Sequence, residues 1–142
     1  MIIKGYAVKY NTLSQSLGGF FEKIEPGAFD KVLRSNPDVT IRFNHDDNLL
    51  LGRTSSGTAS VESDEIGLLY TCSLPKTQTG NDVGVLVRRR DVTGSSFTFY
   101  VKKDEFKMEN GKLIRHVIEA SGLLDCAPVT NPAYLSSTVK EG

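Results

Sequence analysis

In this 142-residue chain, one histidine and one pair of serines have the residue types and sequence surroundings that could support nucleophilic chemistry. A serine hydroxyl is a weak nucleophile until a base takes its proton, and histidine is the most frequent base. His45 follows the apolar run VTIRF, and Ser95 and Ser96 precede the apolar run FTFYV. Gly94 could leave room there for a substrate backbone and for an amide that donates to an oxyanion. Taken alone, the string GSSF is more typical of a turn than of an active site. An exposed histidine is likewise more typical of a solvated loop.

Acidic residues could complete two different kinds of site. A carboxylate that accepts a hydrogen bond from the far imidazole nitrogen would fix the tautomer and stabilise the imidazolium. Glu119 and Asp125, both in the last extended segment, are the candidates for this role. Alternatively, His45, Asp46 and Asp47 could belong to a metal-dependent hydrolase, although three consecutive side chains converge poorly on one ion.

The remaining charged and sulfur-containing residues point to ordinary structural roles. His116 lies in a strand-like run and is expected to be a partly buried structural histidine, with a place in a site left open. The run Arg88–Arg90 is typical of a solvated helix face, or else of a patch for a partner or nucleic acid. Lys+Arg and Asp+Glu both number 17, which argues against a protein that coats nucleic acid or anionic membrane. Cys72 and Cys126 are too few for a disulfide framework or zinc cluster, which favours a reducing compartment.

Extended segments must position these residues. Period-two alternation and β-branched content predict strands over 2–10, 39–43, 57–62, 67–74, 95–106 and 113–130, with another extended piece near 20–25. Short helices are expected over 26–36 and 82–91, although the second is rich enough in valine to form a strand. About seven strands and two helices indicate a β-rich α+β fold, a compact and mostly antiparallel β-barrel with flanking helices. The length predicts one domain over residues 1–135 and a short flexible tail at 136–142.

Five segments occur in a recognisable order along nearly the whole chain. They are GYAVKYN at 5–11, EKIEPGAFDKVL at 22–33, FNHDDNLLLGRT at 43–54, the stretch 67–99 ending in GSSFTF, and RHVIEASGLLDCAPVTNPAY at 115–134. Together they resemble the tailed-bacteriophage prohead (capsid maturation) serine protease family, related to herpesvirus assemblin. Each segment alone is weak, but all five in this order and spacing are specific.

The resemblance implies a serine-type endopeptidase with a herpesvirus-protease-like fold and neither a metal nor an organic cofactor. It makes His45 the general base and Ser96 the nucleophile, because the family's serine directly precedes a phenylalanine, here Phe97. It makes Asp125 the third catalytic residue, at a position where the family usually has glutamate. Glu119 is the competing choice for that third residue.

The resemblance also implies partners and a location. The expected substrates are the scaffold, the precursor of the major capsid protein and the protease itself, cleaved inside the assembling prohead in the host cytoplasm. Self-association is plausible, whereas neither a membrane nor a specific nucleic acid is expected as a partner. The alternative is a catalytically inactive relative that serves as a capsid assembly or scaffolding component, which would need neither His45 nor Ser96.

Overall fold

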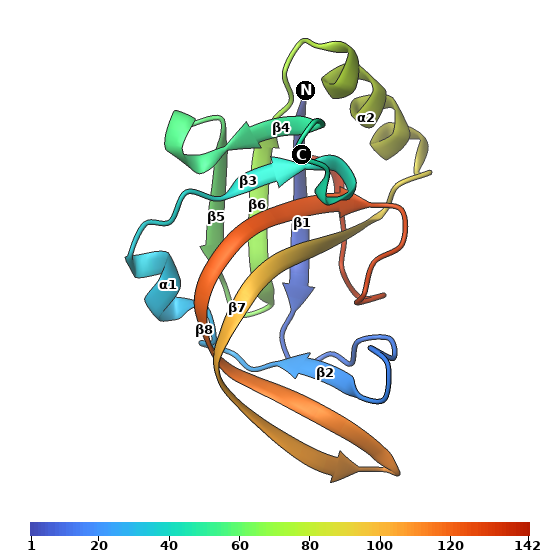
Figure 1. Ribbon diagram of the computed structural model, residues 1–142. Helices are drawn as coiled ribbons and strands as arrows, with labels where there is room; N and C mark the ends of the chain where they lie inside the picture. The colour runs from blue at the N-terminus through green and yellow to red at the C-terminus, as the bar shows by residue number, and fades with distance from the viewer.

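The computed structural model describes all 142 residues, and its strands form two β-sheets flanked by two α-helices (Figure 1). The strands are β1 (Ile2–Lys9), β2 (Phe21–Ile24), β3 (Thr40–Arg42), β4 (Leu50–Arg53), β5 (Ala59–Ser63), β6 (Gly67–Ser73), β7 (Gly94–Glu109), β8 (Lys112–Val129) and β9 (Lys140–Glu141). The helices are α1 (Asp30–Arg34) and α2 (Gln78–Arg89), with 3-10 turns η1 (Phe43–His45) and η2 (Thr54–Ser56).

The first sheet has the order β5-β6-β1-β9, with antiparallel neighbours throughout. The second sheet is built around β8. Strand β7 pairs with it antiparallel along one edge, while β2 and β3 pair with it in parallel, and β4 pairs with β3. Strand β8 is therefore the element that brings segments from the beginning, middle and end of the chain together.

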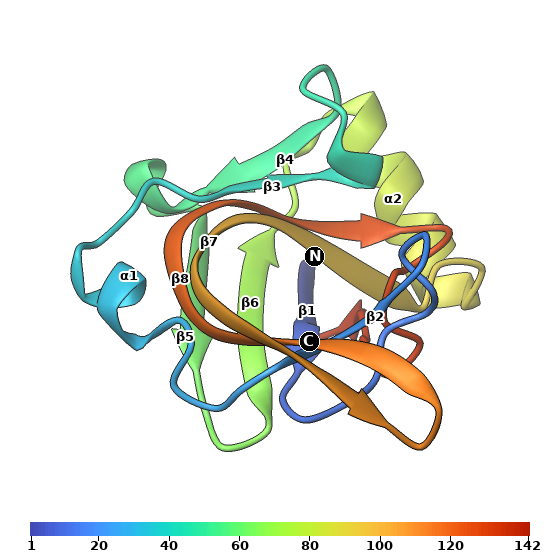
Figure 2. The same ribbon diagram turned by 60° about the horizontal axis from the view of Figure 1, so that its bottom comes forward.

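Strands β7 and β8 are long and strongly curved. They pass across the first sheet as a paired arch and continue beyond it as a hairpin (Figures 1 and 2). The β7–β8 register shifts at several places between Thr98 and Asp104, and such bulges bend strands and increase their twist. The curvature lets one pair of strands cover the core and also carry part of the candidate site.

The core lies between the sheets and includes the phenylalanine of the PGAF segment. Phe29 is fully buried, and its ring contacts Phe97 (centroids 5.8 Å apart) and Phe99 (5.9 Å) edge to face. Gly27, at a φ of +86° that favours glycine, turns the chain ahead of α1. The PGAF segment therefore packs directly behind the strand that carries Ser96.

The structure confirms a β-rich α+β fold with two helices. The predicted closed barrel is not confirmed, because the strands form two sheets, and the second sheet mixes parallel with antiparallel pairs. The segment predicted over 82–91 is helical but begins at Gln78, because the Thr77 side chain accepts a hydrogen bond from the Gly80 amide (3.1 Å) and caps the helix. The helix predicted over 26–36 is limited to Asp30–Arg34, and strands β4 and β9 were not predicted.

The last residues of the chain lie against β1. Val139 is buried, and β9 pairs with β1. The Gly142 amide donates to the Ile2 carbonyl (2.9 Å), so the two termini are adjacent. The flexibility expected of residues 136–142 stays a prediction.

Candidate active site

Three neighbouring strands of the second sheet bring the candidate residues together. Asp125 on β8 pairs with Thr98 on β7 along one edge and with Thr40 on β3 along the other. Ser96 precedes Thr98 by two residues, which places both on the same face of β7. His45 follows β3 directly in η1, which packs on β8.

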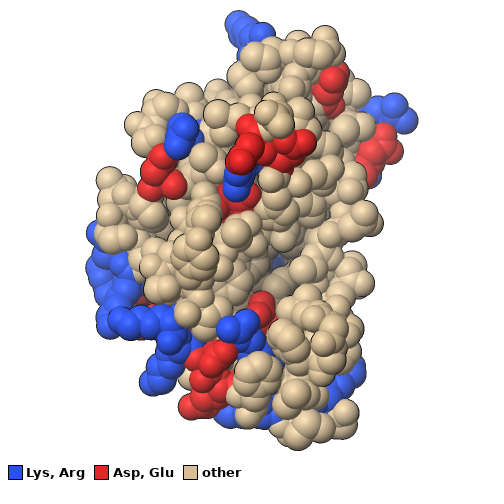
Figure 3. Space-filling view, in the orientation of Figure 1, with Lys and Arg blue, Asp and Glu red and all other residues tan.

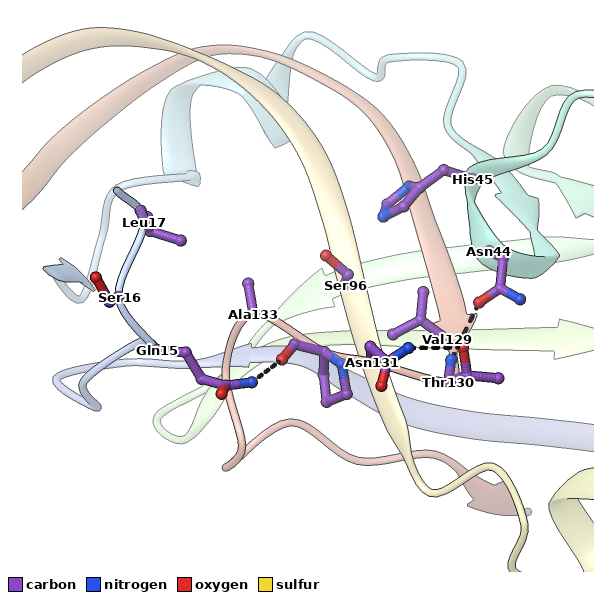
Figure 4. Close-up of a pocket in the computed structure, with 11 residues that line it drawn as sticks. Gln15, Ser16, Leu17, Asn44, His45, Ser96, Val129, Thr130, Asn131 and Ala133 are labelled. Carbon is purple, nitrogen blue, oxygen red and sulfur yellow. Dashed lines mark hydrogen bonds between the residues drawn. The ribbon is translucent and has the colours of Figure 1, made fainter. Parts of the chain in front are cut away.

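His45 is hydrogen-bonded to Asp125 through one ring nitrogen. Its Nδ1 lies 2.8 Å from Oδ2 and 3.0 Å from Oδ1 of Asp125, whose side chain is 0% exposed. Thr98 Oγ1 lies 3.3 Å from the same Nδ1. Nε2 takes part in none of the hydrogen bonds of His45, so it remains available on the side of the ring that faces the cleft (Figure 4).

Arg42 supplies the positive charge that the buried Asp125 requires. Its Nη2 and Nε donate to Asp125 Oδ2 over 2.8 and 3.1 Å, and its Nη1 binds the exposed Asp47. Burial acts to raise the pKa of Asp125, but hydrogen bonds from His45, Thr98 and Arg42 outweigh it and hold this pKa below its usual value. Asp125 therefore stays ionised beside the imidazole.

The backbone of the histidine turn is held in an uncommon conformation. Asn44 and His45 have φ values of +54° and +60°, a region in which asparagine is tolerated better than most residues. Asn44 Oδ1 accepts a hydrogen bond from the Thr130 amide (3.0 Å), just after the end of β8. This bond fixes the histidine turn to the segment that forms the floor of the cleft.

The two serines of the pair face opposite sides of β7. Ser95 is 1% exposed; its Oγ donates to the Thr138 carbonyl (2.8 Å) and is hydrogen-bonded to Tyr70 Oη (2.6 Å). Ser96 is half-buried and lines the cleft with His45, although no hydrogen bond joins the two side chains. Catalytic hydrogen bonds are often long in the free enzyme and shorten when substrate binds, so this geometry is compatible with proton transfer.

The cleft has a volume of about 510 Å³ and contains no carboxylate, lysine or arginine in its lining. Figure 4 shows the Ser96 hydroxyl and the His45 ring directed into one space. On the face shown in Figure 3, charged side chains gather over α1, over the distal parts of β7 and β8 and in the upper part of the molecule, while the middle of the right-hand side is uncharged. The lining residues are Gln15, Ser16, Leu17, Asn44, His45, Ser96, Val129, Thr130, Asn131, Pro132 and Ala133.

Comparison with known proteins decides the family. The family model described as caudovirus prohead serine protease matches residues 1–141. The chain belongs to this family. It is therefore a serine-type hydrolase of phage capsid maturation that acts inside the prohead. No curated protein and no solved structure matches the chain, so the relation to herpesvirus assemblin stays a prediction.

The other residues considered for the site of this prohead protease lie elsewhere. The Glu119 carboxylate pairs with Lys31 (3.1 Å) and Lys102 (3.7 Å) outside the cleft. The ring nitrogens of His116 contact Glu25 (2.7 Å) and Glu109 (3.0 Å), as expected of a structural histidine. Of the two acids, the structure brings only Asp125 to His45.

The side chains of His45, Asp46 and Asp47, which were considered as metal ligands, do not point to a common centre. His45 turns to Asp125, Asp47 binds Arg42, and an oxygen of Asp46 accepts from the Asn48 amide (2.9 Å). No group of three or more His, Cys, Asp and Glu side chains is placed to hold a metal ion.

The two cysteines of the prohead protease are unpaired and buried, outside the cleft. Burial raises the pKa of the Cys72 thiol to about 12 and raises that of Cys126 as well. Because the thiolate is the reactive form, neither residue is a plausible nucleophile. No helix of the protein has the length and apolar character needed to cross a membrane.

Some features of the site were not predicted from the sequence. Arg42 was not considered for the site, but its guanidinium reaches Asp125 from the end of β3. The space expected beside Gly94 for a substrate is filled by Pro132, since a Cβ on Gly94 would lie 2.7 Å from the Pro132 Cγ. Thr98 could have been found, because it lies two residues after Ser96 on a predicted strand.

Proposed function

We propose that this prohead protease is an endopeptidase in which Ser96 is the nucleophile, His45 the general base and Asp125 the residue that orients His45. Ser96 Oγ attacks the scissile carbonyl carbon while His45 Nε2 takes the hydroxyl proton. The imidazolium then gives this proton to the leaving amine, and an acyl-enzyme forms. Water, deprotonated by the same nitrogen, attacks the ester carbonyl carbon. The bond to Ser96 Oγ then breaks, His45 returns the proton to this oxygen, and the second product leaves.

The observation that carries this proposal is the contact between His45 Nδ1 and the buried carboxylate of Asp125. It favours the tautomer with hydrogen on Nδ1, which leaves the lone pair of Nε2 free to accept a proton. An ionised carboxylate beside Nδ1 also stabilises the positive charge that His45 acquires in the reaction.

We further propose that the substrates are the scaffold and the precursor of the major capsid protein, and that the protease also cleaves itself. Membership in a family that acts within the capsid supports polypeptide substrates of this kind. The cleft lining carries no carboxylate, lysine or arginine, which favours uncharged side chains next to the scissile bond.

Trimming of co-expressed capsid precursor, followed by intact mass, tests the proposal. Ser96→Ala should abolish trimming at a defined site. Ser16→Ala is the matched control, because it removes a hydroxyl from the same cleft without touching His45. A serine-directed phosphonate should label the wild-type chain at Ser96 and leave the Ser96→Ala chain unmodified.

The possible outcomes separate the alternatives. Unchanged trimming by Ser96→Ala would refute this nucleophile and bring Ser95 back into consideration. If wild type neither trims nor reacts with the phosphonate but is required for shell assembly, the inactive scaffolding role is the correct one.

A further inference from the structure

A second pocket, of about 420 Å³, lies on the outer face of the first sheet beside the turn that follows α2. Residues of β1 and β6 form its floor, and the chain end and the α2 turn form its walls. None of the residues that line it is acidic, and four are basic: Lys4, Lys9, Arg90 and Lys140.

These four cations have no carboxylate partner, unlike other basic residues nearby. Arg88 on α2 binds Glu141 (2.9 Å), and Arg89 binds Asp91 (3.2 Å). None of the four pocket cations forms an ion pair, and the Lys9 ammonium lies over the Tyr6 ring, 5.8 Å from its centroid. The pocket therefore concentrates positive charge in a molecule whose formal net charge is zero.

The register of the sheet makes this concentration unfavourable in the free protein. Lys4 and Lys140 are directly opposite on the antiparallel strands β1 and β9. Like charges at such positions destabilise a sheet, and Glu141, the acid next to Lys140, pairs with Arg88 instead. An anion bound in the pocket would offset the repulsion between these two lysines.

We infer that the pocket binds the phosphate groups of a ligand. One phosphate group carries up to two negative charges and three acceptor oxygens, so a ligand with two or three phosphates can satisfy four cations. The hydroxyls of Thr93 and Thr138 add donors at the pocket wall. The volume lies within the range of small-ligand sites, which fits a compact polyphosphate or a short piece of nucleic-acid backbone.

This phosphate pocket is separate from the cleft that contains Ser96. Thr93 precedes Ser96 by three residues, and the side chain of Ser95 connects that stretch to the carbonyl of Thr138. The buried Ser95 thus lies between the two sites. Substitutions at exposed lysines of the phosphate pocket leave every proposed catalytic residue in place.

Binding of inorganic tripolyphosphate, measured by calorimetry at low ionic strength, tests the inference. Wild type should bind one equivalent, and the double variant Lys4→Gln/Lys140→Gln should bind at least about tenfold more weakly. The matched control is Lys76→Gln/Lys103→Gln, which removes the same charge from two exposed lysines that line no part of the pocket and form no ion pair. The control should bind as wild type does.

Competition distinguishes the sources of phosphate. If a short single-stranded oligonucleotide displaces tripolyphosphate at a concentration below that of the tripolyphosphate itself, the pocket is assigned to a nucleic-acid backbone. If displacement needs a higher concentration of oligonucleotide than of tripolyphosphate, the pocket is assigned to a soluble polyphosphate. Equal affinity of the pocket and control variants, or displacement by polyglutamate as effective as by phosphate, would overturn the inference. In phosphate-free buffer the pocket variant should unfold at or above the wild-type temperature, which separates lost binding from lost folding.

Discussion

At the scale of single residues, Asp125 connects the groups on either side of it. It accepts hydrogen bonds from His45 and from Arg42 while its own side chain is wholly buried. Removal of one partner from a buried ion pair typically costs about 3–5 kcal/mol, because the other charge is left uncompensated. Arg42 thus allows a short, fully buried carboxylate to remain charged beside the histidine.

Asp125→Asn should reduce kcat by about a hundredfold to ten-thousandfold with little change in KM, because an amide can stabilise the wrong imidazole tautomer and carries no charge. Glu119→Gln is the matched control on the same strand and should leave turnover unchanged, since Glu119 pairs only with exposed lysines. Steady-state cleavage of a peptide from the mapped cleavage site measures both variants. If Glu119→Gln lowered kcat and Asp125→Asn did not, the role of orienting His45 would belong to Glu119.

The lowered pKa of Asp125 also predicts how stability depends on pH. A carboxyl whose pKa is lower in the folded state contributes stability above its unfolded pKa of about 3.9, and that contribution is lost as pH falls through the folded pKa. The difference in unfolding free energy between wild type and Asp125→Asn should therefore be largest at neutral pH and shrink in acid. Urea unfolding at a series of pH values checks this; a difference that grows toward low pH would contradict it.

At the scale of elements, the β3–β4 hairpin determines where the histidine lies. Gly52 allows this hairpin to pack closely, because a Cβ there would lie 2.7 Å from Cys72 Sγ. Thr54 Oγ1 accepts from the Val39 amide (2.9 Å) and donates to the Pro37 carbonyl (3.0 Å). The LGRT segment therefore holds the hairpin in place, while the preceding NHD segment forms the turn.

Asn44→Ala should lower activity by about tenfold or more. Alanine in the left-handed region costs about 1–2 kcal/mol, and the variant also loses the bond to the Thr130 amide. Asn36→Ala places alanine at a similar φ of +53°, in the turn after α1, and should cost similar stability without loss of activity. Asn44→Gly, which relieves the backbone but not the lost bond, should be intermediate in peptide cleavage. Equal activity of Asn44→Ala and Asn36→Ala would show that the turn does not position His45.

The sequence predicted the local elements of the site better than their arrangement. Alternation predicted strands around Ser96 and ahead of His45, but the choice of Ser96 over Ser95 came from the family resemblance and not from the alternation. The parallel pairing of β8 with β2 and β3 depends on contacts between distant segments, which no local pattern encodes. Strands β4 and β9 were missed because LLGR and KE are short and lack period-two alternation.

At the scale of the whole molecule, the end of the chain joins the two sheets. The Thr138 amide donates to the Tyr6 carbonyl (3.1 Å) on β1. The Val139 amide donates to the Thr93 carbonyl (2.9 Å), just ahead of β7. The same segment lines the phosphate pocket and accepts a hydrogen bond from Ser95, so it contacts both proposed sites.

Val139→Ala should lower the free energy of unfolding by about 2 kcal/mol, because the side chain is 1% exposed and its removal leaves a cavity between the sheets. Val85→Ala makes the same change on the exposed face of α2, where Val85 is 53% exposed, and should alter stability by less than about 0.5 kcal/mol. Urea unfolding compares the two variants, and amide exchange at Val139 tests the flexibility predicted for residues 136–142. Strong protection of that amide, together with a large loss of unfolding free energy in Val139→Ala, would make the chain end part of the folded domain. Rapid exchange, together with equally small losses in Val139→Ala and Val85→Ala, would make it the flexible tail.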